Sequence, residues 1–360
     1  MSKQVRTFIV SEIRNRLSVI TLNRPLQLNA FFPPLIDEVL LEMTFWRKHV
    51  DKLSSVLIKG AGDKAFSAGG DVKFLLQAFK ERNLGMISLQ TQGEYSLVHR
   101  LETYSIPTVA LVDGICMGTG GGIFQHSSFS VVSERAIFAM PETAIGIVPD
   151  SGVALPFGRL DHKLGVYLGL TGARLKGASI YHAGLSDFFV SSEYHEALET
   201  ALESAETKEA VKGILKEFHE KSRDRQTPFS LEPHLSEIEN SFSHSTVEQC
   251  MESLSQSSTQ FARETKSTLE KMSPTALKAT LRHINTPYKT LLECLSMDYR
   301  VIYRLCRSHD FIEGVSALLV DKDREPKWRP ASLSEVTDEQ IDSLFQRLPT
   351  EDEFEPIVER

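Results

Sequence analysis

Apolar and polar positions alternate between two patterns along the first half of the chain, one typical of strands and one typical of helices. Short apolar runs bounded by glycine, proline or polar turns predict strands, and they read RLSVITL, LSSVLIKG, PTVALV, FSVVSERAIFAM and LSDFFVSS. Between them, residues 34–50 and 87–103 carry apolar side chains at helical spacing. Strands that alternate with helices are typical of crossover units, so we expect an α/β fold with a largely parallel sheet covered on both faces.

The pattern of the chain changes near Ser191. From there to about Asp310 the sequence is rich in Glu, Lys, Ser and Leu, poor in glycine, and divided by prolines into helix-sized pieces. One more short helix is expected at TDEQIDSLFQRL. At 360 residues the chain exceeds the usual size of one compact core. We therefore expect a core of residues 1–190, a helical region of residues 191–345 that packs on it, and a polar tail of residues 346–360.

Composition and charge exclude several classes of protein. Hydrophobic residues make up 41% and charged residues 24% of the chain, and no apolar run approaches the roughly 20 residues that span a bilayer. The net charge of −8 argues against direct binding to nucleic acid. We expect neither a metal site nor a disulfide framework, because metal-ligand and Cys-x-x-Cys spacings are absent around Cys116, Cys250, Cys294, Cys306, His99, His126, His182 and His309. No targeting segment is visible at the N-terminus.

Three glycine-bearing stretches each follow a predicted strand and precede a predicted helix. They read KAFSAGGDVKFL, DGICMGTGGGIF and MPETAIGIVPDSG. Backbone N–H groups at a helix start have no acceptor within the helix, so they can stabilise negative charge on a ligand oxygen. A dinucleotide-binding loop is disfavoured because these glycines follow a third or later strand, and no Gly-Lys-Ser/Thr forms a Walker loop. Two such turns that face each other predict an oxyanion hole.

The stretch MPETAIGIVPDSG also holds two carboxylates, Glu142 and Asp150, in a nearly uncharged run. A carboxylate that loses water without a partner is costly, so such neighbours indicate either tight hydrogen bonding or chemical use. The structural alternative is helix capping by Glu142 and turn capping by Asp150. Beside an oxyanion hole, a carboxylate could attack a thioester carbonyl or activate water against it.

Several motifs together resemble a known family. LNRPLQLNA, KAFSAGGDVKFL, PTVALVDGICMGTGGG and FAMPETAIGIVPDSG are similar to the enoyl-CoA hydratase/isomerase (crotonase) superfamily. LTGARLKGASIYHAGL, KMSPTALKATLR and HDFIEGVSALLVDKDREPKW extend the similarity to its 3-hydroxyisobutyryl-CoA hydrolase family, from about Phe8 to about Leu344. The resemblance implies a spiral ββα core with C-terminal helices, a coenzyme A thioester as substrate with no further cofactor, and valine catabolism. It also implies a mitochondrial location, with the cytosol as the alternative.

The resemblance assigns roles to individual residues. It implies that the backbone amides of Gly70 and Thr119 form the oxyanion hole, although the family usually has glycine at the second position. Glu142 is implied as nucleophile or general base, and Asp150 as the contact to the substrate hydroxyl. Glu94 would line the acyl pocket, unless it lies on a solvated helix face. Further contacts to the substrate are implied, less specifically, for Lys64, Ala65, Ala68, Gly69, Asp71 and Gly118, with Asn29 and Ala30 in the matching early motif.

One position separates the reactions of the superfamily. Its hydratases use a second glutamate where this chain has Gly122, so the pair of carboxylates that water addition requires is lost and hydrolysis is favoured. Two alternatives stay open. One is hydratase or isomerase activity on another acyl-CoA, and the other is a structural subunit of a larger assembly such as a mitochondrial ribosome, which Thr119 in the oxyanion turn would suit. The resemblance implies trimers or hexamers, which are common in the superfamily, but the extra C-terminal helices could cover those surfaces, so a monomer or a dimer is equally expected.

Overall fold

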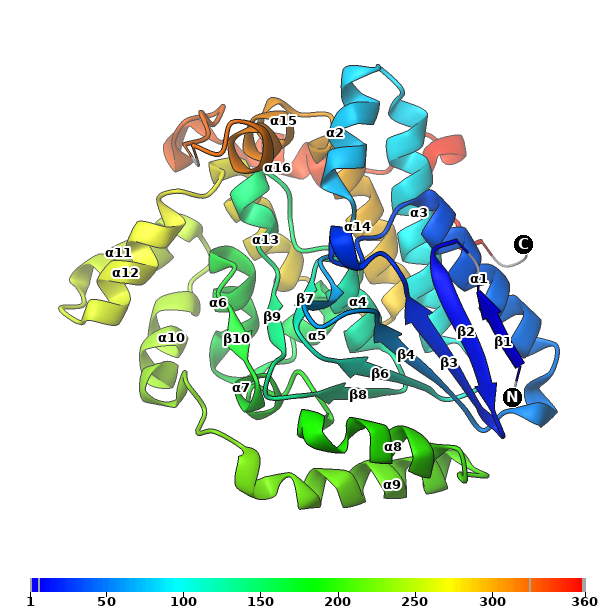
Figure 1. Ribbon diagram of the computed structural model, residues 1–360. Coiled ribbons are helices and arrows are strands. Elements are labelled where there is room, and N and C mark those ends of the chain that lie inside the picture. The colour runs from blue at the N-terminus through cyan, green and yellow to red at the C-terminus, as the bar shows by residue number, and fades with distance from the viewer. Residues whose placement is uncertain (1, 6, 324, 358–360) are drawn as a thin grey trace.

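The computed structural model describes residues 2–5, 7–323 and 325–357 and contains two β-sheets surrounded by helices (Figure 1). The larger sheet has the strand order β1-β2-β3-β4-β6-β8-β11. Its first three strands pair antiparallel, and every later pair is parallel. The strands are β1 (Ser2–Val5), β2 (Ile9–Arg14), β3 (Leu17–Leu22), β4 (Ser55–Gly60), β6 (Thr108–Val112), β8 (Phe129–Val132) and β11 (Phe188–Phe189).

The smaller sheet has the order β10-β9-β7-β5 and repeats the path of the larger one. Its strands are β5 (Ala65–Ser67), β7 (Ile115–Met117), β9 (Ile137–Ala139) and β10 (Leu175–Lys176). The chain passes three times from the larger sheet into the smaller one, from β4 to β5, from β6 to β7 and from β8 to β9, and then into a helix. This repetition is the spiral ββα core that the sequence motifs imply.

Helices cover both faces of the larger sheet, as the alternation of apolar residues predicts. Along β3, Leu17 and Val19 belong to a cluster with Leu198 of α8 and Leu215 of α9, which run together below the sheet in Figure 1. Ile20 and its neighbours face the opposite side, toward α1, α3 and α4. These helices are α1 (Pro33–Arg47), α3 (Leu84–Glu102), α4 (Thr119–His126), α8 (His195–Leu202) and α9 (Lys208–Lys221).

Residues after Ser191 are helical as expected, and polar side chains start many of the helices. Thr207, Thr246, Thr259, Ser273, Thr290 and Ser308 each accept a hydrogen bond from a backbone amide in the first helical turn. The expected short helix near residue 340 is also present, with a capping box between Thr337 and Gln340. Among the described residues, no helix combines the length and the apolar character that a membrane crossing requires. The remaining helices are α2 (Val72–Lys80), α5 (Ala154–Phe157), α6 (Leu164–Thr171), α7 (Ala178–His182), α10 (Leu235–Phe242), α11 (Val247–Gln256), α12 (Gln260–Leu269), α13 (Pro274–Ile284), α14 (Leu291–Leu305), α15 (His309–Val315) and α16 (Asp338–Phe345).

The helical region reaches back to the spiral core through α14, which packs against α3. Residues 346–357 also lie against this pair of helices: Leu348 and Phe354 are buried in the main core, and the Ile357 amide donates to the Ser96 hydroxyl. The segment therefore supports the two helices that stand behind the candidate site.

Candidate active site

The two glycine turns predicted from the sequence lie against each other at the ends of β5 and β7. Gly69 has φ of +92°, and Gly118 has φ of +51° with ψ of −129°, conformations that residues with side chains avoid. A side chain at Gly118 would begin 3.2 Å from the Gly69 Cα. Glycine is therefore required at both positions, by backbone angle and by the close approach of the two turns.

Two backbone amides at these turns have no acceptor within the described part of the chain. Phe31 forms an isolated β-bridge with Gly70. Its two hydrogen bonds run from the Phe31 amide to the Gly69 carbonyl and from the Asp71 amide to the Phe31 carbonyl, so the Gly70 amide takes no part in the bridge. Thr119 is the first residue of α4, and its amide has no acceptor in the helix. The Gly70 nitrogen lies 3.9 Å from the point where a Gly118 side chain would begin, next to Thr119. Both donors line one cavity, as an oxyanion hole requires.

This cavity has a volume of about 950 Å³ and opens between the spiral core and the C-terminal helices. Apolar side chains from α2, α14 and the segment after β9 form much of its wall, among them Phe74, Leu75, Ile145, Ile147 and Ile302. Four carboxylic acids line the same space, namely Glu94, Glu142 and Asp150, with Asp71 at the start of α2. A long, largely apolar pocket with a few polar groups is the usual form of a small-molecule site.

Glu142 lies at the start of a short 3₁₀ helix, Glu142–Ile145, directly after β9. Its Oε1 is 3.4 Å from the point where a Gly118 side chain would begin, and its buried Oε2 has no hydrogen-bond partner among the described residues. Burial, and then the charge of Asp150, raise the pKa of Glu142 well above its ordinary value. Glu142 is the first residue of this helix, whose cap position is Pro141, and hydrogen bonding to its own backbone acts in the opposite direction and lowers its pKa.

Asp150 and Glu94 approach the same space with partners of their own. The Tyr95 hydroxyl donates to Asp150 Oδ2 at 2.6 Å, and burial followed by the charge of Asp298 raises the pKa of Asp150 to about 7. Glu94 is 6% exposed, so the solvated helix face left open by its sequence is wrong. Burial and then Asp150 raise the pKa of Glu94 to about 8. Because Asp150 also raises the pKa of Glu142, the titrations of these acids are coupled.

The side chain of Thr119 is accommodated beside the acids. It is 2% exposed, and its hydroxyl forms a hydrogen bond with the Glu94 carboxyl, whose Oε1 also accepts from the Gln90 amide at 2.9 Å. The β-branched residue thus finds a polar partner in Glu94, while its main-chain amide stays available. The substitution of the usual glycine is compatible with an oxyanion hole.

Gly122 has a physical reason to be glycine. A side chain there would begin 2.6 Å from both the Cβ and the carbonyl oxygen of Ser151. Ser151 belongs to the turn that follows Asp150 and has a φ of +59°. The space that a second glutamate would need is therefore filled by the turn that carries Asp150.

The less specific assignments divide into two groups. Ala30, Ala68, Asp71 and Gly118 line the cavity. Asp71 also caps α2 through the Phe74 amide and pairs with Arg24 at 3.1 Å, so part of its role is structural.

Lys64 and Ala65 do not line the cavity, and the expected main-chain contacts of these two residues to the nucleotide stay a prediction. Their carbonyl groups accept from the Ile115 amide and the Asn29 side chain, because both residues lie where β5 pairs with β7. Asn29 is fully buried and ties neighbouring loops together. The amide and carbonyl of Gly69 are likewise used within the fold.

Sequence reasoning missed residues that act on the acids from other elements. Tyr95 lies on α3 and Asp298 on α14, and neither stands in a recognisable motif. The four cysteines are free and buried. Cys306 lines the cavity, but burial raises the pKa of its thiol, which leaves a carboxylate as the available nucleophile or base. His126 is half-buried, and desolvation lowers its pKa to about 4, which fits the predicted structural role.

Comparisons with known proteins give a consistent result. Residues 17–345 match the family model described as enoyl-CoA hydratase/isomerase. A mouse protein named 3-hydroxyisobutyryl-CoA hydrolase, mitochondrial, is 43% identical over 348 residues, covering 96% of this chain and 90% of that protein. The crystal structure of a carnitinyl-CoA dehydratase from Mycobacterium thermoresistibile matches with a TM-score of 0.89 at 28% identity, over 98% of this chain and 100% of that one. An enoyl-CoA hydratase from Rhodobacter sphaeroides 2.4.1 matches with a TM-score of 0.86 at 30% identity, over 97% and 100%.

Proposed function

Because the chain belongs to the enoyl-CoA hydratase/isomerase family, we propose that it hydrolyses 3-hydroxyisobutyryl-CoA to 3-hydroxyisobutyrate and free coenzyme A, a step of valine catabolism. The observation that carries the proposal is the position of Glu142 beside two glycine turns, with no room for a second glutamate at Gly122. A buried carboxylate beside two free amides suits thioester cleavage, whereas hydration in this superfamily uses a second glutamate at the position where this chain has Gly122.

The reaction uses the chain's own groups and water, and coenzyme A belongs to the substrate. The thioester oxygen sits between the amides of Gly70 and Thr119, which stabilise the negative charge that develops on it. Ionised Glu142 either attacks the carbonyl carbon to form an anhydride, which water then opens, or removes a proton from an attacking water. Both routes expel the coenzyme A thiolate. The raised pKa of Glu142 makes its ionised form a stronger base than an exposed carboxylate.

Asp150 supports the choice of a 3-hydroxyacyl group. Tyr95 donates to one oxygen of its carboxylate, and the other oxygen can accept a hydrogen bond from a substrate hydroxyl. A site built to pair with a hydroxyl discriminates strongly against an analogue that lacks it, because the buried acceptor is then left without a partner.

The test measures thiol release from 3-hydroxyisobutyryl-CoA by the parent and by Glu142→Gln, which preserves shape and removes the charge. Turnover in the variant should fall by at least roughly 10²-fold. Glu217→Gln is the matched control, because Glu217 is an exposed residue on α9, and it should keep the parent activity. Parent-like thiol release by Glu142→Gln would remove Glu142 from the mechanism. Trapping with hydroxylamine separates the two routes, since an anhydride yields a hydroxamate on Glu142.

Two further measurements address the alternatives. Loss of the conjugated absorbance of crotonyl-CoA would reveal hydratase activity, which the Ser151 contact at Gly122 argues against. Co-purification with a large assembly, together with no thiol release, would favour a structural subunit. The word mitochondrial in the name of the mouse relative supports a mitochondrial location, with the cytosol as the alternative, and cell fractionation tests this.

A further inference from the structure

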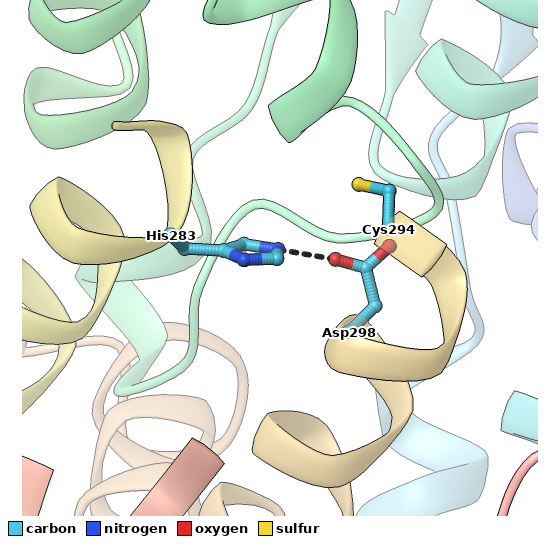
Figure 2. Close-up of side chains that lie close together, drawn as sticks. All are labelled: His283, Cys294 and Asp298. Atoms are coloured by element: carbon cyan, nitrogen blue, oxygen red, sulfur yellow. Dashed lines mark hydrogen bonds and ion pairs between the residues drawn. The ribbon is translucent and has the colours of Figure 1, made fainter. Parts of the chain in front are cut away.

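A buried pair of residues in the C-terminal helices stands behind the candidate site. His283 lies near the end of α13 and Asp298 in the middle of α14, and both are fully buried. Figure 2 shows the imidazole of His283 facing the Asp298 carboxylate across the gap between the two helices, with Cys294 one helical turn before Asp298. A buried charge of this kind is costly unless every oxygen has a donor.

Both oxygens of the Asp298 carboxylate have such donors. The backbone amide of Gly152 donates to Oδ2 at 2.7 Å, and Oδ1 is hydrogen-bonded to His283 Nε2. The other ring nitrogen, Nδ1, lies 2.6 Å from the Tyr288 hydroxyl. A neutral ring with its proton on Nε2 gives every group in this series of hydrogen bonds a partner, because Nε2 donates to Asp298 and the Tyr288 hydroxyl donates to Nδ1.

The contact to Gly152 matters because this residue follows Asp150 by two positions. Ser151 and Gly152 have φ of +59° and +80°, so the turn needs external support to keep its shape. The Gly152 carbonyl lies 3.2 Å from His126 Nε2, and its amide is held by Asp298. The backbone that carries Asp150 is thus anchored from the helical region rather than from the spiral core alone.

Hydrogen bonding accounts for this cluster without a metal ion. Cys294 completes a group of three potential ligands whose donor atoms all lie within 4.8 Å of one another. Both oxygens of Asp298 and both ring nitrogens of His283 already have partners.

We propose that Asp298 is a positioning residue of the hydrolase, which holds the Asp150 turn through the Gly152 amide and places a fixed negative charge behind Asp150. This inference rests on the proposed function, because Asp150 is assigned there to the substrate hydroxyl. It makes selection of the hydroxyl depend on a residue 148 positions further along the chain, on a helix outside the glycine turns.

The electrostatic setting of Asp150 supports the second part of the proposal. After burial, the charge of Asp298 is the largest influence that raises the pKa of Asp150 to about 7, and the Tyr95 hydroxyl acts in the opposite direction. The side chains that act on Asp150 are Asp298 of α14 and Tyr95 of α3. The charge of Asp150 in turn raises the pKa of the ionisable groups around it, which are Glu94, Tyr95, Glu142, Cys294 and Cys306.

The test compares Asp298→Asn, which keeps an acceptor for the Gly152 amide and removes the charge, with Asp298→Ala, which removes both. Each variant is assayed for thiol release from 3-hydroxyisobutyryl-CoA and isobutyryl-CoA across pH, beside Cys294→Ala as a control within the same cluster. We expect Asp298→Asn to move the ascending limb of kcat/KM against pH to lower pH. Asp298→Ala should lose roughly 10- to 100-fold in kcat/KM for the hydroxylated substrate, and less for isobutyryl-CoA.

The outcomes separate this inference from the proposed function. If both Asp298 variants lose thermal stability and lower activity equally on the two substrates, with an unmoved pH limb, Asp298 is merely structural and the inference is wrong. If the parent releases no thiol, the proposed function fails, yet the charge effect is still measurable. In that case infrared difference spectra, assigned with Asp150→Asn, should show the Asp150 carboxyl ionising at lower pH in Asp298→Asn, and an unchanged transition would refute the effect.

Discussion

Gly118→Ala tests whether the junction of the two glycine turns is the oxyanion site. The added methyl group would begin 3.2 Å from the Gly69 Cα and 3.4 Å from Glu142 Oε1. It would also force a residue with a side chain into φ of +51° and ψ of −129°. Relief of either conflict must move the Gly70 or Thr119 amide, because those residues adjoin the contact.

The expected effects on stability and on turnover differ greatly in size. A residue held in a glycine-only conformation costs roughly 1–3 kcal/mol, which for a chain of this length lowers Tm by about 1–4 °C. Loss of one oxyanion donor costs roughly 10²–10³ in kcat. The variant should therefore remain folded at 25 °C while losing most of its thiol release.

Thiol release and thermal unfolding are measured on the same preparation, with Gly213→Ala as the matched control. Gly213 lies in α9 with open space where its side chain would begin, so alanine there should stabilise the helix by up to about 1 kcal/mol and leave turnover unchanged. If folded Gly118→Ala turns over within about threefold of the parent, the two turns do not bind the thioester oxygen, since one lost donor costs far more than that.

Three other predictions follow from the acids and from Gly122. Because ionised acids are required and their pKa values are raised, kcat/KM should increase with pH around neutrality. Tyr95→Phe should move this ascending limb to higher pH, because it removes the hydrogen bond that lowers the pKa of Asp150. Glu94 is protonated when folded up to about pH 8 but ionises from about 4.5 when unfolded, so its burial becomes more costly as pH rises between these values. In chemical denaturation, the free energy of unfolding of Glu94→Gln should then rise relative to that of the parent by up to about 1.4 kcal/mol per pH unit in this range. A difference between the two proteins that stays constant with pH would contradict the raised pKa. Gly122→Glu should lower Tm and add no water to crotonyl-CoA, because Ser151 occupies the space its side chain needs; hydration by a folded variant would refute the steric argument.

Local pattern was enough to predict several elements of the fold. The apolar runs at β3, β4, β6 and β8 and the helical spacing of apolar residues in α1 and α3 reflect side-chain periodicity, which is visible over a few residues. The glycine turns could be located for the same reason, since their position between a strand and a helix is visible in the chain itself. Family motifs then placed Glu142, Asp150 and Glu94, and the structure brings all three to one cavity.

Tertiary packing decided what surrounds those residues. The burial of Glu94, the pairing of Lys64 and Ala65 within the smaller sheet, and the filled space at Gly122 depend on which segments meet, and no local rule contains that information. Asp298 is the clearest case, because its hydrogen bond to Gly152 joins residues 146 positions apart. The sequence by itself determined which side chains can carry the chemistry. The fold decided their pKa values and partners, because these depend on burial and on charges that only the assembled chain brings close.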